Sequence, residues 1–236
     1  MEQAMTMQKP TKVTGLGWAF LILFAYVFAS VFYAIGYSIL GPENIAFSEF
    51  VYTPTGLAYG ILTPFIITLP LIIFAASRTS SGCIESLGFK RFSKKHLIES
   101  LIIFAAFYAF SNLVSHVFEI EAGDFLTSIA NSQNLLLFLA ISLCAPILEE
   151  LFFRGYLFNR LRHTKLGFIG TAFITSLLFT LAHITQYSLP QLSLIMLLAL
   201  ILFWVRERTG SIWLPMLIHF LQNVITGFVI IYLGLV

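Results

Sequence analysis

The stretch LLLFLAISLCAPILEELFFRGYLF, residues 135–158, decides how the rest of the chain is interpreted. It is mostly apolar and exceeds the roughly 20 residues that a membrane-crossing helix needs. It nevertheless contains the ionisable side chains of Glu149, Glu150 and Arg154. Each ionised group at mid-bilayer costs roughly 2.5–3.5 kcal/mol even on the lenient insertion scale. A span that keeps three such groups is therefore predicted to use them, together with polar partners from other spans.

The composition of the whole chain is that of a membrane protein. Of its 236 residues 58% are hydrophobic, only 10% are charged, and the mean hydropathy is +0.92. A soluble domain carries about 25% charged residues. The aromatic content of 16% excludes a disordered chain, and the small net charge of +2 makes nucleic acid an unexpected partner. Cys83 and Cys144 stand singly, so neither a disulfide framework nor a zinc knuckle is expected.

The predicted fold class is all-α: a polytopic transmembrane helix bundle of about seven to eight spans with a cytoplasmic N-terminus. The apolar stretches that could span a membrane are residues 16–40, 56–76, 97–118, 135–158, 166–184, 189–205 and 212–236. Lys and Arg accumulate on the cytoplasmic side of membrane proteins. The loops here alternate in sign, beginning with Lys9 and Lys12 in the tail, which places that tail inside. We predict a cytoplasmic tail (1–15), N-terminal membrane spans (16–134) and a catalytic membrane core (135–236).

The spacing of the charges in the fourth stretch predicts different partners for the two glutamates. Glu150 and Arg154 are four residues apart, on one helix face and in the order that favours an ion pair. Glu149 points about 100° away from its neighbour and so faces something else. Pro146 removes a hydrogen bond from the helix ladder and frees a carbonyl, which membranes tolerate only against protein or water.

Two later stretches carry polar partners. His183 follows Phe179 by one turn, and His219 precedes Asn223 by one turn, with Pro215 one turn earlier still and predicted to open the backbone again. Because unsatisfied polar groups in hydrocarbon are costly, these side chains are expected to face Glu149 and Glu150 across an internal cavity. The structural alternative is an ion cluster that only locks the helices together, with His183 as a packing residue.

A buried glutamate beside an imidazole is suited to activating water as a general base, and donors such as His219 and Asn223 suit a developing oxyanion. HExxH, in which both histidines share one helix with the glutamate, is absent. If a metal such as Zn²⁺ binds, its ligands must come from separate helices, namely Glu149, His183 and His219, with one position open for water. These residues alone leave metal-activated and glutamate-activated water as alternatives.

The pattern resembles a known family. Glu149-Glu150-x-x-x-Arg154, Phe179-x-x-x-His183 and His219-x-x-x-Asn223 are similar to the three motifs of the CPBP intramembrane endopeptidases, the type II CAAX prenyl protease and bacteriocin-processing or Abi family. The resemblance covers roughly residues 135–226. It implies that Glu149 and His183 activate water, that His219 and Asn223 stabilise the oxyanion, and that Glu150 and Arg154 support them. The family is traditionally labelled metalloprotease, but a metal-free glutamate mechanism fits the same residues and is the one we favour.

The resemblance implies hydrolysis of peptide bonds in membrane-associated proteins or peptides, within the lipid bilayer of a prokaryotic cell membrane. Prenylated substrates belong to the eukaryotic members, so prenylation is not implied here. Two other functions fit the polar cluster. A non-catalytic scaffold or bacteriocin-immunity factor would use it for packing, and an ion-coupled transporter would use it as a proton relay.

Overall fold

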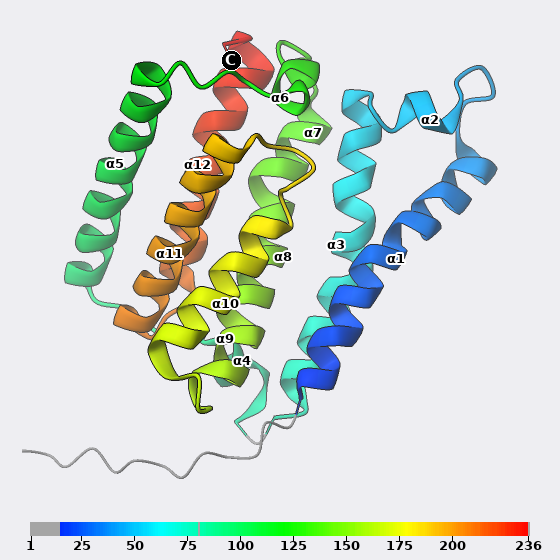
Figure 1. Cartoon of the computed structure of the whole chain (residues 1–236). Coiled ribbons are helices and arrows are strands. Elements are labelled where there is room, and N and C mark those ends of the chain that lie inside the picture. Colours follow the sequence, from blue (N-terminus) through cyan, green and yellow to red (C-terminus); the bar gives the residue numbers. More distant parts are fainter. Residues whose placement is uncertain (1–14, 80, 236) are drawn as a thin grey trace, which may run out of the picture.

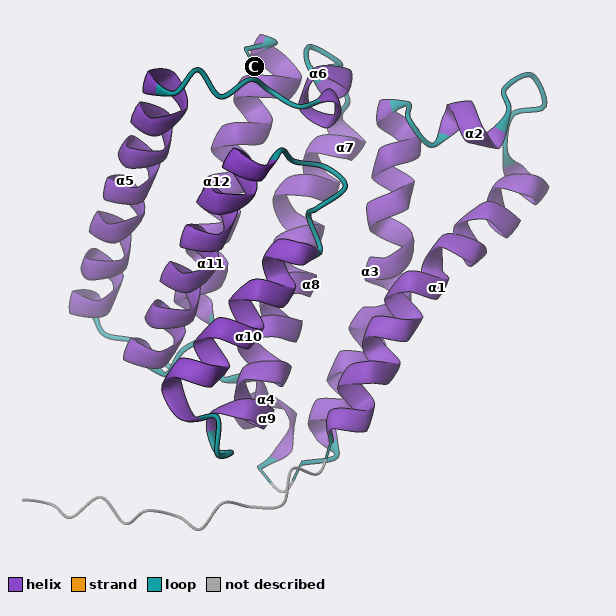
Figure 2. Ribbon diagram, viewed as in Figure 1, coloured by secondary structure: helices purple, strands orange, loops and turns teal. Residues whose placement is uncertain are grey.

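The computed structural model describes residues 15–79 and 81–235, and the predicted cytoplasmic tail with Lys9 and Lys12 lies outside them, Gly15 excepted. Every regular element in the described residues is helical, with no strand (Figure 2). Two of the elements, η1 and η2, are π-helical turns, in which each N–H donates to the carbonyl five residues earlier. The elements are α1 (Leu16–Leu40), α2 (Phe47–Phe50), α3 (Pro54–Ser77), α4 (Gly82–Leu87), α5 (Lys94–Val117), α6 (Asp124–Ile129), α7 (Leu135–Leu139), η1 (Ala140–Cys144), α8 (Ala145–Glu150), η2 (Leu151–Leu157), α9 (Phe158–Arg162), α10 (Gly167–Leu181), α11 (Leu189–Thr209) and α12 (Trp213–Leu233).

The polytopic helix bundle predicted from the sequence is confirmed. Six helical segments are long and apolar enough to cross a membrane: α1, α3, α5, the continuous segment Leu135–Arg162, α11 and α12. The segment predicted as the fifth span, residues 166–184, is shorter than expected, because α10 holds only 15 residues and ends at Leu181. A 15-residue helix is about 22 Å long, less than the roughly 30 Å hydrocarbon core.

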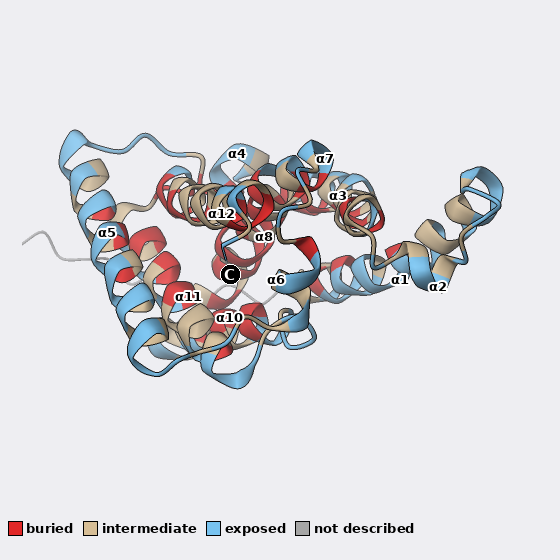
Figure 3. Cartoon of the chain, turned by 90° about the horizontal axis from the view of Figure 1, so that it is seen from above, coloured by how far each residue is buried: buried red, intermediate tan, exposed pale blue. Residues whose placement is uncertain are grey.

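The helix Leu135–Arg162 lies at the centre of the bundle. Seen from above, buried residues gather around α8 and its neighbours α10, α11 and α12, whereas α1 and α2 project to one side (Figure 3). Every residue from Glu150 to Phe158 is buried. Gly155 allows this packing, because a Cβ at that position would lie 3.1 Å from methyl carbons of both Leu87 and Ile212.

The turn after α10 and the packing of α3 set the position of the candidate site. After α10 the chain turns through residues 182–188, and a reciprocal capping box between Ser188 and Gln191 starts α11. Of the N-terminal spans, α1 and α3 pack on the core mainly through α3, which contacts η1, α8 and η2, whereas α5 packs directly on α11 and α12 (Figure 1). The α1 helix packs mainly on α3, and its first turn is held where the Tyr156 hydroxyl donates to the Gly15 carbonyl at 2.9 Å.

The backbone opening predicted at Pro215 is wrong. Pro215 lies in the first turn of α12, which begins at Trp213. The first four N–H groups of a helix have no intrahelical partner in any case, so a proline there removes no hydrogen bond from the ladder. The helix then continues without interruption past His219 and Asn223 to Leu233.

Candidate active site

The backbone opening predicted at Pro146 is present, and it connects two of the motifs. The π-helical turn η1 ends where the Ala145 N–H donates to the carbonyl of Ala140, five residues earlier. Continuing that pattern would require an N–H from Pro146 to the carbonyl of Ile141, and proline has none. The side-chain amide of Asn223 on α12 takes its place and donates to the Ile141 carbonyl at 3.0 Å. Asn223 therefore has a structural partner as well as a face on the cavity described below.

Glu150 and Arg154 form the ion pair that their spacing predicts. The Arg154 Nη1 donates to the Glu150 Oε1 at 2.9 Å, and both side chains are essentially inaccessible. A second guanidinium nitrogen donates to the Ala199 carbonyl of α11 at 3.0 Å. The same Glu150 oxygen lies 3.0 Å from the Nδ1 of His219, so the carboxylate joins its own helix to α12, and Arg154 extends the network to α11. Buried charges are stable only when paired and hydrogen-bonded in this way.

Glu149 faces the two histidines. Its Oε2 lies 4.0 Å from the Nε2 of His183 and 3.8 Å from the Nε2 of His219. These distances are too long for direct hydrogen bonds, and this buried oxygen has no hydrogen-bond partner among the described residues. The Glu149 side chain as a whole is 22% exposed, whereas that of Glu150 is fully buried. Adjacent glutamates thus have different surroundings.

His183 does not lie on a helix, contrary to its placement in the predicted fifth span. It lies two residues beyond the end of α10, in the turn toward α11. Its Nδ1 is 2.8 Å from the Phe179 carbonyl, which can only accept, so the Nδ1 carries the proton. In the neutral ring the Nε2 that faces Glu149 is then an acceptor.

Phe179 contacts side chains of all three polar motifs. Its ring contacts the rings of His183 and His219 at centroid separations of 5.0 and 5.5 Å, and the Arg154 guanidinium lies over it at 4.4 Å. It is 1% exposed. A cation over an aromatic face is attracted by the ring quadrupole, so the phenylalanine of the second motif supports both imidazoles and the ion pair.

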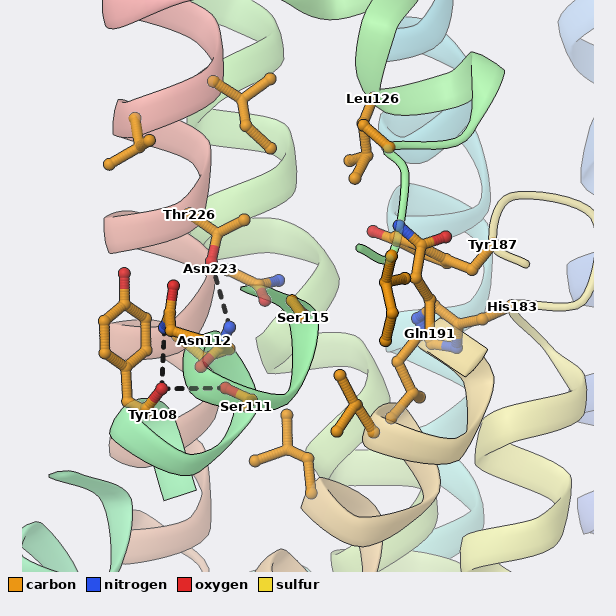
Figure 4. A pocket seen from close by; sticks show the side chains of 18 of the residues that line it. Tyr108, Ser111, Asn112, Ser115, Leu126, His183, Tyr187, Gln191, Asn223 and Thr226 are labelled. Carbon is orange, nitrogen blue, oxygen red and sulfur yellow. Dashed lines mark hydrogen bonds between the residues drawn. The ribbon is translucent and has the colours of Figure 1, made fainter. Parts of the chain in front are cut away.

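A cavity of about 340 Å³ lies beside the histidines. Figure 4 shows side chains of α5 on one side and His183, Tyr187 and Gln191 on the other. Sequence reasoning missed the α5 contribution, which comes from Tyr108, Ser111, Asn112 and Ser115. Their spacing of i, i+3, i+4 and i+7 is that of one helix face. This polar stripe in an otherwise apolar span could have indicated from the sequence that α5 lines a cavity.

Tyr187 adds a hydrogen-bond donor to this cavity. It lies in the turn between α10 and α11, and its ring is 6.0 Å from that of His183. Burial, with a smaller contribution from the negative charge of Glu149, raises the pKa of Tyr187 to about 12. Its phenol therefore keeps its proton at neutral pH and can donate a hydrogen bond.

The fit to a metal ion is poor as the side chains stand. Within residues 15–79 and 81–235 no group of three or more His, Cys, Asp or Glu side chains is arranged to hold one. The Nδ1 of His219 is directed at Glu150, and the two Nε2 atoms approach Glu149 itself. Zinc ligation by nitrogen and oxygen places the donors about 2.0–2.2 Å from the ion.

Comparison with known proteins identifies the segment that contains these residues. Residues 131–225 match the model of the family described as type II CAAX prenyl endopeptidase Rce1-like. The chain is also 34% identical over 113 residues to a protein of Escherichia coli described as "Uncharacterized 24.3 kDa protein", an alignment that covers 45% of this chain. The chain spans about half of that relative, 52% of its length. No solved structure matches.

The match confirms the family that the three motifs predicted. Together with the six helices long enough to cross a bilayer, it makes the chain an integral membrane protein. The segment with the paired glutamates, both histidines and Asn223, residues 131–225, matches the Rce1-like family of type II CAAX prenyl endopeptidases.

Proposed function

We propose that this chain is an intramembrane endopeptidase of a prokaryotic cell membrane, and that Glu149 and His183 activate the water that hydrolyses the peptide bond. One observation carries the proposal. A buried carboxylate oxygen without a hydrogen-bond partner faces two imidazole nitrogens at 3.8 and 4.0 Å, and both imidazoles line the cavity. Polar groups separated by more than about 3.5 Å are commonly bridged by a water molecule.

The proton positions support water at this point. Neutral His183 donates its Nδ1 N–H to the Phe179 carbonyl, so its Nε2 presents a lone pair to the Glu149 carboxylate. Two acceptors repel each other unless a donor lies between them, and water has two protons to give. In the proposed reaction Glu149 takes one proton as the water oxygen bonds to the substrate carbonyl carbon. The C–N bond then breaks, the transferred proton goes to the leaving amine, and the products are a carboxylic acid and an amine.

We assign the oxyanion to His219 and Asn223. The Glu150 carboxylate accepts a hydrogen bond from the Nδ1 N–H of His219. A doubly protonated His219 ring would therefore have its Nε2 N–H free to donate toward the cavity. With Glu149 and Glu150 ionised, that imidazolium and Arg154 would bring the buried cluster to a net charge of zero, which favours its burial. Asn223 uses one N–H on the Ile141 carbonyl and has a second to offer. Fixed donors directed at a developing negative charge are the largest single contribution in many hydrolases.

A metal-dependent variant would use the same residues. Glu149, His183 and His219 would hold the ion after their side chains rearranged. A bound Zn²⁺ would lower the pKa of a water ligand and polarise the scissile carbonyl.

The second candidate is a non-catalytic scaffold, and one observation favours it. The Glu150–Arg154–His219 network is completely buried and joins three helices, as a packing device would. It does not account for Glu149, whose inner oxygen makes no hydrogen bond in the described structure. A packing role alone gives no reason for Glu149 to face two imidazoles at distances that fit a bridging water.

The test compares the new peptide termini in membranes that contain the wild type, Glu149→Gln or Glu99→Gln. Glu99 is the matched control, because it is a glutamate of α5 whose partners are the exposed Lys95 and Arg208. We expect termini in the wild-type and Glu99→Gln membranes that are missing with Glu149→Gln at equal protein level. Termini that persist in Glu149→Gln, or a wild type that yields none, would contradict the proposal. Loss of cleavage with a chelator, restored by zinc, would replace the metal-free mechanism with the metal-dependent one.

A further inference from the structure

The two ends of the bundle differ sharply in charge. Apart from buried Arg154, every Lys and Arg that the structure describes lies at the end where α3, α9 and α11 finish and α5 begins. These residues are Arg78, Lys90, Arg91, Lys94, Lys95, Arg160, Arg162, Lys165, Arg206 and Arg208. The opposite end, where α2, α6 and the C-terminus lie in Figure 1, carries only acidic charges in its described residues. Lys and Arg mark the cytoplasmic side, so the acidic end is extracytoplasmic.

The cavity lies in the extracytoplasmic half of the bundle. On α5 its lining runs from Phe107 to Ser115, the half next to the acidic loop, and on α11 it runs from Gln191 to Leu198, again the half near that end. Ile120 of the acidic loop, Leu126 of α6 and Leu235 after α12 complete the upper rim. No lining residue comes from the basic end of the described chain.

The described lining combines apolar with polar side chains and carries no fixed charge. It includes hydroxyl and amide side chains from α5, α11 and α12, as well as the two histidines. Among the described residues that line it there is no Lys, Arg, Asp or Glu. Such a surface can hydrogen-bond an extended backbone but cannot neutralise a charged side chain or a free C-terminal carboxylate, whose burial without a partner is costly.

We propose that this cavity takes its substrate from the extracytoplasmic side of the membrane. The substrate would be a membrane-anchored or exported peptide segment that is uncharged where it contacts the lining. The proposal rests on the proposed function only for the cleavage itself, since the direction of the opening is a separate property. Because every described lining residue lies in the half of the bundle next to the acidic end, we expect a peptide held at the cytoplasmic face not to reach the cavity.

Accessible cysteines test the direction of the opening without any reference to activity. In a Cys144→Ser background, Ser115→Cys reports on the cavity, Ser128→Cys on exposed α6, and native Cys83 on the basic end. With a membrane-impermeant maleimide on intact cells we expect Ser115→Cys and Ser128→Cys to label, and Cys83 to label only after permeabilisation. Cys83 labelling in intact cells, or Ser115→Cys labelling only after permeabilisation or not at all, would overturn the proposal.

The positions of the cleavage sites give a second, independent test of the sidedness. Glu149-dependent termini should map to extracytoplasmic segments of their substrates, and labelling Ser115→Cys in intact cells should remove most of the cleavage that this variant shows before labelling. Cut sites on the cytoplasmic side would refute the proposed sidedness even if cleavage depends on Glu149. If instead the termini do not depend on Glu149 while the labelling pattern holds, the proposed function fails and the orientation stands.

Discussion

The first membrane helix and the helix that carries the paired glutamates have nearly the same hydropathy but different environments. Within Leu16–Leu40 and Leu135–Arg162, the most apolar 18-residue windows have mean hydropathies of 2.2 and 2.1, yet 17% of the first window and 44% of the second is buried inside the protein. Lipid tails are as apolar as leucine, so hydrophobicity puts a helix into the membrane without choosing its neighbours. Contacts between polar groups and the close approach at small residues make that choice, and the second helix has both.

The largest difference between the two regions should appear at the buried ion pair. Arg154→Met leaves the Glu150 carboxylate buried without its cation, and breaking a buried pair costs about 3–5 kcal/mol of unfolding free energy. The matched change Arg208→Met removes an exposed partner of Glu99 at 3.9 Å and should cost roughly 0–1 kcal/mol. Denaturation of the purified proteins in the same detergent measures both. Similar losses in the two variants would mean that burial of the pair does not matter.

A middle-sized effect is expected where α12 compensates for Pro146. Asn223→Ala leaves the Ile141 carbonyl without its donor, and an unsatisfied buried acceptor costs about 1–3 kcal/mol. In a Pro146→Ala background the restored backbone N–H can supply that donor, so Asn223→Ala should then cost less. A double-mutant cycle of unfolding free energies measures this coupling. Equal costs of Asn223→Ala in the two backgrounds would show that the Asn223 amide does not compensate for the N–H that Pro146 lacks.

The smallest effect should be found on the first helix. Phe32 is 57% exposed at the α1 surface, so Phe32→Ala should change the unfolding free energy by less than about 0.5 kcal/mol. The matched core change Phe152→Ala, at a residue only 5% exposed, should cost about 3–5 kcal/mol. A large loss at Phe32 would show that this exposed face of α1 has a packing partner.

The polar pattern could be predicted from sequence because its rules are local. The i, i+4 spacing of Glu150 and Arg154 was enough for the ion pair, and the missing N–H of Pro146 was enough to expect a free carbonyl. The membrane bundle followed from composition and run length alone. Residues 131–225 could be assigned to a family because three short motifs occur in order.

The features that failed prediction depend on tertiary structure. No local rule ends α10 at Leu181 and puts His183 into a turn, since the apolar run continues to Ile184. The π-helical turn η2 lies within the fully buried stretch from Glu150 to Phe158, and period-based reasoning assumes 3.6 residues per turn. Pro215 was misjudged although the predicted stretch began at residue 212, because a proline in the first turn of a helix interrupts no hydrogen bond. The catalytic roles remain predictions that only activity can test.

The most direct measurement compares two adjacent residues. Glu149→Gln and Glu150→Gln are made in the same background, and membrane-peptide cleavage and thermal unfolding are recorded for each. We predict that Glu149→Gln loses cleavage and keeps the wild-type melting temperature, because its inner oxygen supports no hydrogen bond. Glu150→Gln should melt at a lower temperature, because Arg154 and His219 both depend on its charge. Wild-type cleavage by Glu149→Gln, or the same stability loss in both variants, would contradict the separate roles assigned to them.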